Sequence, residues 1–246
     1  MDLKRELLRL LDEDEDLIVL DKPAGMMTHT VAEKISGTLV NALLYHCRDL
    51  SGIGGELKPG VVHRLDKLTS GVMVAAKSER AHLKLAEQFK RHSIERAYLA
   101  LVWGNPKGDS GRIESRIARN PRQRLKMTGR RGMGKIAITE WRVKRRFKHF
   151  SLIECRLFTG RTHQIRVHLS EMGFPLVGDA LYGKGRQASE KIAPEIRDAL
   201  KDLNRQALHA YKLGFEHPVS GKWLSFNSPL PSELNMLIQL LEQFDQ

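Results

Sequence analysis

Short apolar segments recur along this 246-residue chain, and most of them end at a glycine, a proline or a charged residue. Strand-like patterns are expected within residues 16–25, from 61, and at 71–77, 96–103, 136–146, 150–158, 208–215 and 222–227. Helical apolar stripes are expected at 38–46, 78–92, 161–173 and after Pro231, with short helices at 3–11 and within 183–206. Because strands and helices do not alternate regularly, an α+β fold is favoured over a doubly wound parallel sheet.

The composition favours a globular cytoplasmic protein. Hydrophobic residues make up 41% of the chain, which is enough for a substantial core. No apolar run approaches the roughly 18 residues that a membrane span needs, and the N-terminal residues lack a secretory apolar segment. The two cysteines, Cys47 and Cys155, are too few for a disulfide framework and fit a reducing compartment.

The positive charge of the chain is concentrated in one region. The formal net charge is +12 and the pI is about 9.8. Residues 104–146 hold 14 Lys and Arg against three acids, whereas residues 12–16 are all acidic. A local basic stretch is typical of a protein that binds a polyanion such as RNA, although a solvated basic face would give the same count.

The loop His63-Arg64-Leu65-Asp66-Lys67-Leu68-Thr69-Ser70-Gly71 places one carboxylate among basic neighbours. His63, Arg64 and Lys67 would favour the ionised form of Asp66, which a nucleophilic carboxylate requires. Apolar strands on both sides of the loop would hold it rigidly, and Gly71 can adopt a positive φ where the chain returns to the sheet. Taken alone, an aspartate in a loop is nearly always an ordinary turn residue with surface partners.

Four motifs together resemble the RluA-type RNA pseudouridine synthases. The loop at 63–71 is similar to the family's catalytic loop, DKPAG at 21–25 to its first motif, and ERAYLALVWG at 95–104 to its R-x-Y strand. The segment FTGRTHQIRVHLSEMGFPLVGDALYG at 158–183 resembles its late motif. The order and spacing agree, and the resemblance covers residues 17–230.

The resemblance assigns a catalytic role to three residues. Asp66 matches the catalytic aspartate, Tyr98 the tyrosine that stacks on the target base, and Arg166 the basic residue that pairs with the aspartate. Arg64 matches the arginine that enters the RNA in place of the flipped nucleotide. A long basic hairpin or loop is expected at residues 116–135. The remaining expected RNA-binding residues are basic residues of the aspartate loop, of this hairpin and of the late motif: Lys67, Arg116, Arg119, Arg122, Arg124, Lys126 and Arg161.

The residues by themselves leave some of these assignments open. Tyr98 alternates with Ala100 and Val102 on one strand face, so it could be a core aromatic, and Arg166 could be a surface cation. His163 and His168 are five residues apart, which is not the spacing of a zinc-binding helix, so no metal site is expected.

The resemblance further implies a single catalytic domain, residues 1–246, with a bent, mostly antiparallel sheet, flanking helices and a central RNA cleft. The S4 RNA-binding domain that many members carry at the N-terminus is not expected in this sequence, so the chain is either a member without that domain or a catalytic fragment of a longer protein. The implied activity is isomerisation of uridine to pseudouridine, without a cofactor, by a monomer. The sequences of the motifs are most similar to those of members that act on large-subunit ribosomal RNA. Transfer RNA is the alternative substrate, and a non-catalytic RNA-binding or ribosome-assembly protein is the rival function.

Overall fold

The computed structural model describes residues 9–29, 36–47, 50, 59–129, 132–183 and 192–245. The chain divides into two compact units. Unit 1 comprises Met1–Arg96 and Ala210–Ser228, and unit 2 comprises Ala97–His209 and Pro229–Gln246.

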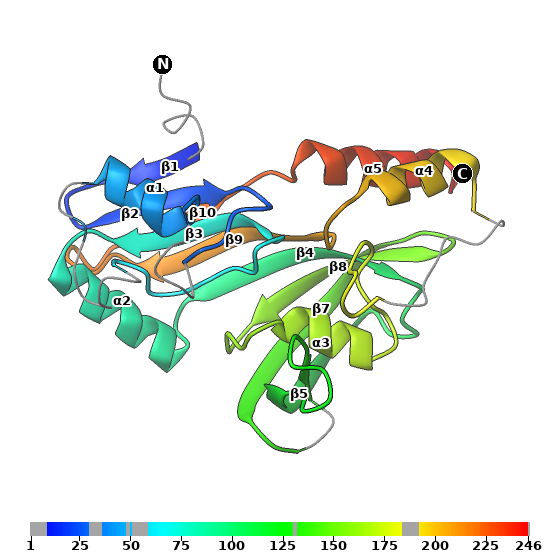
Figure 1. Ribbon diagram of the computed structural model, residues 1–246, viewed down its shortest axis with the longest axis horizontal. Helices are drawn as coiled ribbons and strands as arrows, with labels where there is room; N and C mark the ends of the chain where they lie inside the picture. The colour runs from blue at the N-terminus through cyan, green and yellow to red at the C-terminus, as the bar shows by residue number, and fades with distance from the viewer. Residues whose placement is uncertain are drawn as a thin grey trace. The chain divides into compact units, whose positions relative to one another are not determined.

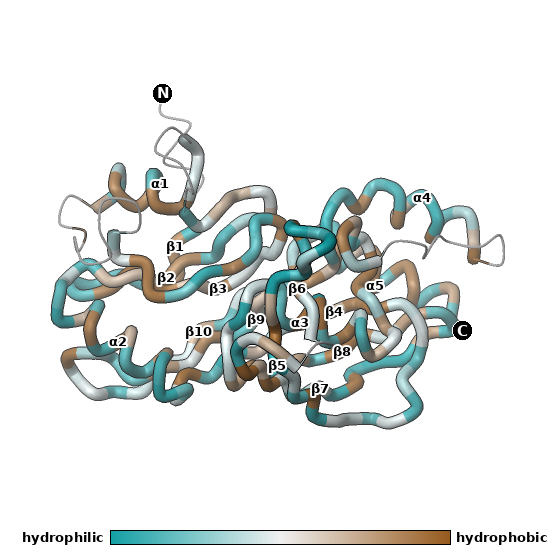
Figure 2. The backbone as a smooth tube through the Cα atoms, turned by 60° about the horizontal axis from the view of Figure 1, so that its bottom comes forward, coloured by the Kyte–Doolittle hydropathy of each residue, from teal (hydrophilic) through white to brown (hydrophobic). Residues whose placement is uncertain are grey.

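Unit 1 is built on strands in the order β1-β2-β3-β9, with β10 paired to β9. These strands are β1 (Arg9–Glu13), β2 (Leu17–Lys22), β3 (Ser70–Ala76), β9 (Leu208–Glu216) and β10 (Trp223–Asn227). The pairs β1–β2, β2–β3 and β9–β10 are antiparallel. Its two helices, α1 (Leu39–His46) and α2 (Glu79–Arg91), lie on opposite sides of these strands (Figure 1, Figure 2).

Local sequence sets the ends of both helices in unit 1. The Ser78 side chain accepts a hydrogen bond from the Ala81 amide and begins α2, which ends at His92 in the left-handed conformation. A capping box of Thr38 and Asn41 begins α1. The apolar side of α2 then packs on one face of β2 and β3, in a core that includes Leu17, Val19, Val72, Val74, Ala81 and Leu85.

Unit 2 is an antiparallel sheet in the order β4-β8-β7-β5-β6. Its strands are β4 (Glu95–Trp103), β5 (Ser110–Arg119), β6 (Met127–Thr128), β7 (Lys135–Arg146) and β8 (Phe150–Leu157). Its helices are α3 (Gln164–Glu171), α4 (Pro194–Asp202) and α5 (Ser232–Gln243).

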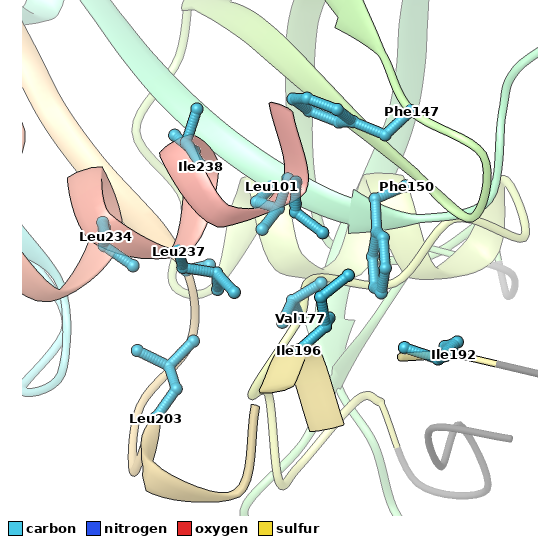
Figure 3. Close-up of a cluster of buried hydrophobic side chains, with 12 residues drawn as sticks. Leu101, Phe147, Phe150, Val177, Ile192, Ile196, Leu203, Leu234, Leu237 and Ile238 are labelled. Carbon is cyan, nitrogen blue, oxygen red and sulfur yellow. The ribbon is translucent and has the colours of Figure 1, made fainter. Parts of the chain in front are cut away.

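The core of unit 2 fixes which face of β4 is covered by α5. Leu101 packs with Leu234, Leu237 and Ile238 of α5 in a buried cluster (Figure 3). Since successive side chains of a strand point to opposite faces, Tyr98 lies on the face away from α5. The face that carries Tyr98 is therefore not the one that α5 occupies.

The expected α+β class and the mostly antiparallel pairing are confirmed, as are the strands at 17–22, 70–76, 95–103, 135–146, 150–157, 208–216 and 223–227. The helix expected at 3–11 is wrong where the structure describes it, because Arg9–Glu13 forms β1 by pairing with β2. Residues 3–8 of that segment, and most of the loop expected at 49–60, lie outside the described residues. The apolar stripe expected at 38–46 is only partly buried in α1, because Leu39 and Leu43 are buried whereas Leu44 is 48% exposed.

Within the described residues, no helix is both long and apolar enough to cross a membrane. The single domain, the bend of the sheet and the central cleft concern the relation between the two units, so they stay predictions.

Candidate active site

The aspartate loop, residues 63–69, leads directly into the buried strand β3 of unit 1. Asp66 is half-buried, and its carbonyl accepts a hydrogen bond from the Thr69 amide at 3.0 Å, which closes a turn. Leu65 is only 4% exposed and anchors the loop in the core. The loop therefore holds the Asp66 backbone in one conformation while leaving the residue partly accessible.

Gly71, the second residue of β3, has the positive φ expected where the chain returns to the sheet. Its φ is 125°, in the region that favours glycine, and a Cβ there would lie 2.2 Å from the Ala210 carbonyl oxygen. Any side chain at this position would force β3 away from β9.

A buried lysine joins the DKPAG segment to the aspartate loop. Lys22 has no exposed surface, and its Nζ donates to the carbonyl oxygens of Pro23, Met26 and Lys67 at 2.9, 2.8 and 3.3 Å. The Gly25 amide also donates to the Lys67 carbonyl, at 2.9 Å. A buried ammonium is tolerated only when it is well hydrogen-bonded, so Lys22 acts as a bracket between the two segments.

A second attachment lies on the other side of Asp66. The Thr28 hydroxyl, which is buried, donates to the Leu65 carbonyl at 3.1 Å. The backbone is thus held at Leu65 and at Lys67, the two neighbours of Asp66.

His63 does not serve as a cationic neighbour of Asp66, and this part of the sequence interpretation is wrong. Its ring stacks on Phe89 of α2 with centroids 4.6 Å apart, and its Nε2 accepts the Val74 amide at 3.1 Å. Burial, with the nearby charge of Arg96, lowers the pKa of His63 to about 3. The ring is therefore neutral and fastens the aspartate loop to α2 and β3.

The other two basic residues of the loop are exposed. Arg64 and Lys67 both face solvent, and Arg64 Nη1 lies 3.4 Å from His29 Nε2. They are placed as cations that a polyanion could reach, which is compatible with their expected contact with RNA.

In unit 2, Tyr98 lies directly opposite Cys155 of β8 in the sheet register. The tyrosine is 8% exposed, and Ala100 and Val102 of the same strand face are fully buried. Tyr98 therefore has little exposed surface, as the core-aromatic alternative expects, and its role in stacking on a base stays a prediction.

Arg166 is buried on α3 and forms a fork with Asp179. Its Nε donates to Asp179 Oδ2 at 2.7 Å and its Nη2 donates to Oδ1 at 3.0 Å. The Arg166 side chain is 9% exposed and that of Asp179 is 1% exposed, so Arg166 is not a surface cation. The expected pairing of Arg166 with Asp66 joins the two units and stays a prediction.

Tyr182 connects α3 to the hairpin β5–β7. Its hydroxyl accepts the Met127 amide at 2.8 Å and lies 2.9 Å from His163 Nδ1. The Arg166 guanidinium lies 5.0 Å from the centre of the Tyr182 ring, and Lys126 Nζ lies 5.8 Å from it. One aromatic residue thus contacts both Arg166 and the basic hairpin.

A buried amide sets the start of α3. Gln164 is 3% exposed and bonds Thr159, Thr139, the Ile138 carbonyl and the Arg161 amide at 2.8 to 3.0 Å. These bonds fix the first turn of the helix that carries Arg166. Sequence reasoning missed Lys22, Gln164, Asp179 and Tyr182, although all four stand inside the quoted motifs.

The expected RNA-binding residues of the hairpin region differ in exposure. Arg116, Arg119, Arg122 and Arg124 are exposed, whereas Lys126 and Arg161 are half-buried. Arg161 Nε also donates to the Ile136 carbonyl at 2.9 Å. All except Arg161 lie on β5 or on the turn that follows it.

Two clusters in the described part of the chain bring three possible metal ligands together, but internal bonds already use their atoms. In the first, Glu13, His46 and Cys47, the Lys77 ammonium lies 2.8 Å from Glu13 and would repel a metal cation. In the second, Asp14, Asp16 and His217, both ring nitrogens of His217 are bonded, to Asp14 and to backbone amides. We interpret both clusters as structural.

Comparison with known proteins identifies the family. The model of a family described as RNA pseudouridylate synthase matches residues 16–171, which include Asp66, Tyr98 and Arg166. A ribosomal large subunit pseudouridine synthase D of Zymomonas mobilis is 48% identical over 95% of this chain and 73% of that protein. The chain belongs to the RNA pseudouridylate synthase family.

Other relatives agree with this family assignment. An uncharacterized RNA pseudouridine synthase of Bacillus subtilis is 45% identical over 94% of this chain and 72% of that protein. The solved structure of human RNA pseudouridylate synthase domain containing 1 has a TM-score of 0.69 at 26% identity, covering 96% of this chain and 94% of that one. Human RNA pseudouridylate synthase domain containing 4 shares the fold, with a TM-score of 0.75 at 24% identity over 98% and 95% of the two chains.

Proposed function

We propose that this pseudouridine synthase isomerises specific uridines of large-subunit ribosomal RNA, with Asp66 as its nucleophile. The observation that carries the proposal is the half-buried Asp66 on a loop whose backbone is fixed on both sides, at Leu65 by Thr28 and at Lys67 by Lys22. The substrate class is supported by relatives named ribosomal large subunit pseudouridine synthase D in Zymomonas mobilis and in Neisseria meningitidis.

The reaction needs little beyond positioned side chains. The C1′–N1 bond of the uridine breaks, the uracil turns, C5 joins C1′, and the C5 hydrogen leaves as a proton while N1 gains one. Because nothing is oxidised or reduced and no group is transferred to another molecule, the proposed mechanism uses no cofactor.

In this proposal each of the three catalytic residues has one task. Asp66 acts as the carboxylate nucleophile, Tyr98 stacks on the flipped uracil and is the candidate acceptor for the C5 proton, and Arg166 pairs with Asp66. A guanidinium held by Asp179 at two atoms keeps a fixed orientation, so Arg166 could orient Asp66 without large loss of side-chain entropy.

RNA binding is assigned to cations of both units, most of them exposed and two of them, Lys126 and Arg161, half-buried. Arg64 would take the place of the flipped nucleotide, next to the nucleophile. The remaining phosphate contacts are proposed for Lys67, Arg116, Arg119, Arg122, Arg124, Lys126 and Arg161. Each phosphate that they neutralise adds to the salt dependence of binding. The enzyme is proposed to act as a monomer in the cytoplasm.

Two alternatives predict different results. A transfer RNA synthase would share the same catalytic residues and differ in substrate. A non-catalytic RNA-binding or ribosome-assembly protein would have no need of Asp66 and Tyr98, and both are present in the expected motifs.

The test is release of tritium from RNA labelled at uracil C5, with wild-type protein and Asp66→Asn. Ribosomal RNA, intact large subunits and transfer RNA serve as parallel substrates. Release from ribosomal RNA by the wild type alone, with RNA binding unchanged in the variant, is the expected result. Release from transfer RNA only would make transfer RNA the substrate instead of ribosomal RNA. No release from any of the three RNAs would favour the binding-protein alternative.

A further inference from the structure

The turn between β5 and β6, residues 119–126, is ordered by its own hydrogen bonds. Asn120 Oδ1 accepts the amides of Arg122 and Gln123 at 2.9 and 3.2 Å. The Asn120 amide donates to the Lys126 carbonyl, and the Lys126 amide donates to the Gln123 carbonyl, each at 2.8 Å. We call these residues the basic turn; its backbone is set before any partner binds.

The basic turn is also fastened to the helix that carries Arg166. Immediately after it, the Met127 amide donates to the Tyr182 hydroxyl at 2.8 Å. The Thr128 hydroxyl and the Gly129 amide donate to Glu171 Oε1 of α3 at 2.8 and 3.0 Å. A residue displayed on the basic turn is therefore held in a fixed position relative to α3.

The basic turn displays one large apolar side chain. Leu125 is 81% exposed, the highest value among the large apolar residues in the described part of the chain. Arg124 precedes it, Lys126 follows it, and the Arg119 guanidinium donates to the Arg124 carbonyl at 3.0 Å. The turn thus holds an apolar side chain in water between two cations.

The surroundings of Leu125 favour one class of partner. Residues 115–139 contain eight Lys and Arg and no Asp or Glu. A protein partner with an apolar pocket would also have to present a strongly acidic surface, whereas RNA offers phosphates for the cations and base faces for the leucine. Apolar side chains that insert between base steps, flanked by cations on the backbone, are an established way of unstacking nucleic acid.

We propose that Leu125 is an apolar wedge that inserts between stacked bases of the RNA while the flanking cations contact its phosphates. Insertion would offset part of the free-energy cost of unstacking bases near the target uridine. The proposal deepens the proposed function and rests on it for the identity of the bound RNA.

The test compares Leu125→Ala with Leu83→Ala, a control leucine on α2 that is 59% exposed. The probes are large-subunit ribosomal RNA and a short unstructured uridine-containing oligonucleotide. We expect Leu125→Ala to weaken binding of the ribosomal RNA about five- to tenfold, which is roughly 1 kcal/mol, with the oligonucleotide unaffected. Leu125→Phe, which keeps an apolar wedge, should restore binding.

Salt dependence separates a wedge from a charge effect. Leu125→Ala removes no cation, so the slope of log affinity against log salt should stay at the wild-type value. Equal binding of ribosomal RNA by Leu125→Ala and wild type would overturn the wedge. Absence of C5 tritium release by the wild type would overturn the proposed function instead, and the binding comparison would still decide the role of Leu125.

Discussion

Arg166 and Asp179 form a buried fork in unit 2, with Nε–Oδ2 at 2.7 Å and Nη2–Oδ1 at 3.0 Å. Asp179 Oδ1 also accepts the amides of Leu181 and Tyr182, both at 3.0 Å. Both carboxylate oxygens therefore accept hydrogen bonds, from the Arg166 guanidinium and from the backbone after α3. We expect Asp179 to orient Arg166 for its proposed pairing with Asp66.

Asp179→Asn should lower turnover more than it lowers RNA affinity. The amide cannot accept both guanidinium bonds, so Arg166 loses its orientation and part of its compensating charge. We expect single-turnover C5 tritium release to fall about 10- to 100-fold, with the dissociation constant for RNA within about twofold of wild type. Breaking a buried ion pair should also lower the free energy of unfolding by about 3 kcal/mol, so the assay is run well below the melting temperature.

The control for this variant is Asp198→Asn, which removes an exposed carboxylate on α4. It should leave turnover, affinity and stability at wild-type values. Full turnover by Asp179→Asn would show that Arg166 does not depend on Asp179 for its task.

Lys22→Met should loosen the aspartate loop. The buried ammonium holds three carbonyl oxygens, including that of Lys67, and the apolar replacement leaves them without this donor. We expect a loss of about 3 kcal/mol in the free energy of unfolding, measured by urea denaturation, and a fall in turnover at temperatures where the variant is folded. Lys90→Met, on the exposed side of α2, is the matched control. If Lys22→Met lowered the free energy of unfolding no more than Lys90→Met does, Lys22 would not act as a bracket.

The elements of the fold were predictable because their signals are local. The leucine stripe of α5, the Ser78 cap of α2 and the apolar run of β3 each specify one element from neighbouring residues. The segment at β1 was mistaken for a helix because the mixed leucines and charged residues of 3–11 are too few to distinguish a helix from a strand. Pairing with β2 decides its conformation.

The site was predictable only where the chemistry lies in one motif. Asp66 stands out in its loop, whereas the lowered pKa of His63 is caused by its burial and by the charge of Arg96, 33 positions later in the sequence. Likewise the partner of Arg166, Asp179, lies 13 residues away, beyond the end of α3. Periodicity carries no information on such contacts, because they are created by the packing of separate elements.

Alanine at Arg122, Arg124 and Lys126 together should flatten the salt dependence of RNA binding. These side chains belong to the basic turn, and each one that contacts a phosphate contributes a little under one unit to the slope of log affinity against log salt. We expect the slope to fall by about two to three units if all three contact phosphates, with turnover on saturating RNA little changed. A triple variant on α2, Arg80, Lys84 and Lys90 to Ala, should keep the wild-type slope, and an unchanged slope in the basic-turn variant would remove these residues from the RNA interface.

Acid should destabilise the protein through its buried histidines. Burial lowers the pKa of His168 to about 4, against the weaker opposing effect of Glu171, and its two ring nitrogens lie within 3.0 Å of the hydroxyls of Thr139 and Ser115. The unfolded chain binds a proton at this histidine more readily than the folded chain does. The contribution of His168 to the free energy of unfolding is therefore fully present above about pH 6.5 and decreases as the pH falls toward 4. In that window, each such histidine should lower the free energy of unfolding by about 1 kcal/mol for each pH unit of acidification.

Replacing His168 with Gln isolates its share of the pH dependence. Urea unfolding at pH 7.5 and at 4.5 should give a smaller difference for His168→Gln than for wild type, because one fewer group takes up a proton on unfolding. His63, whose pKa is lowered to about 3, still contributes in the variant, so part of the dependence remains. An identical difference in the two proteins would mean that His168 is already protonated, or equally accessible to protons, in the folded chain.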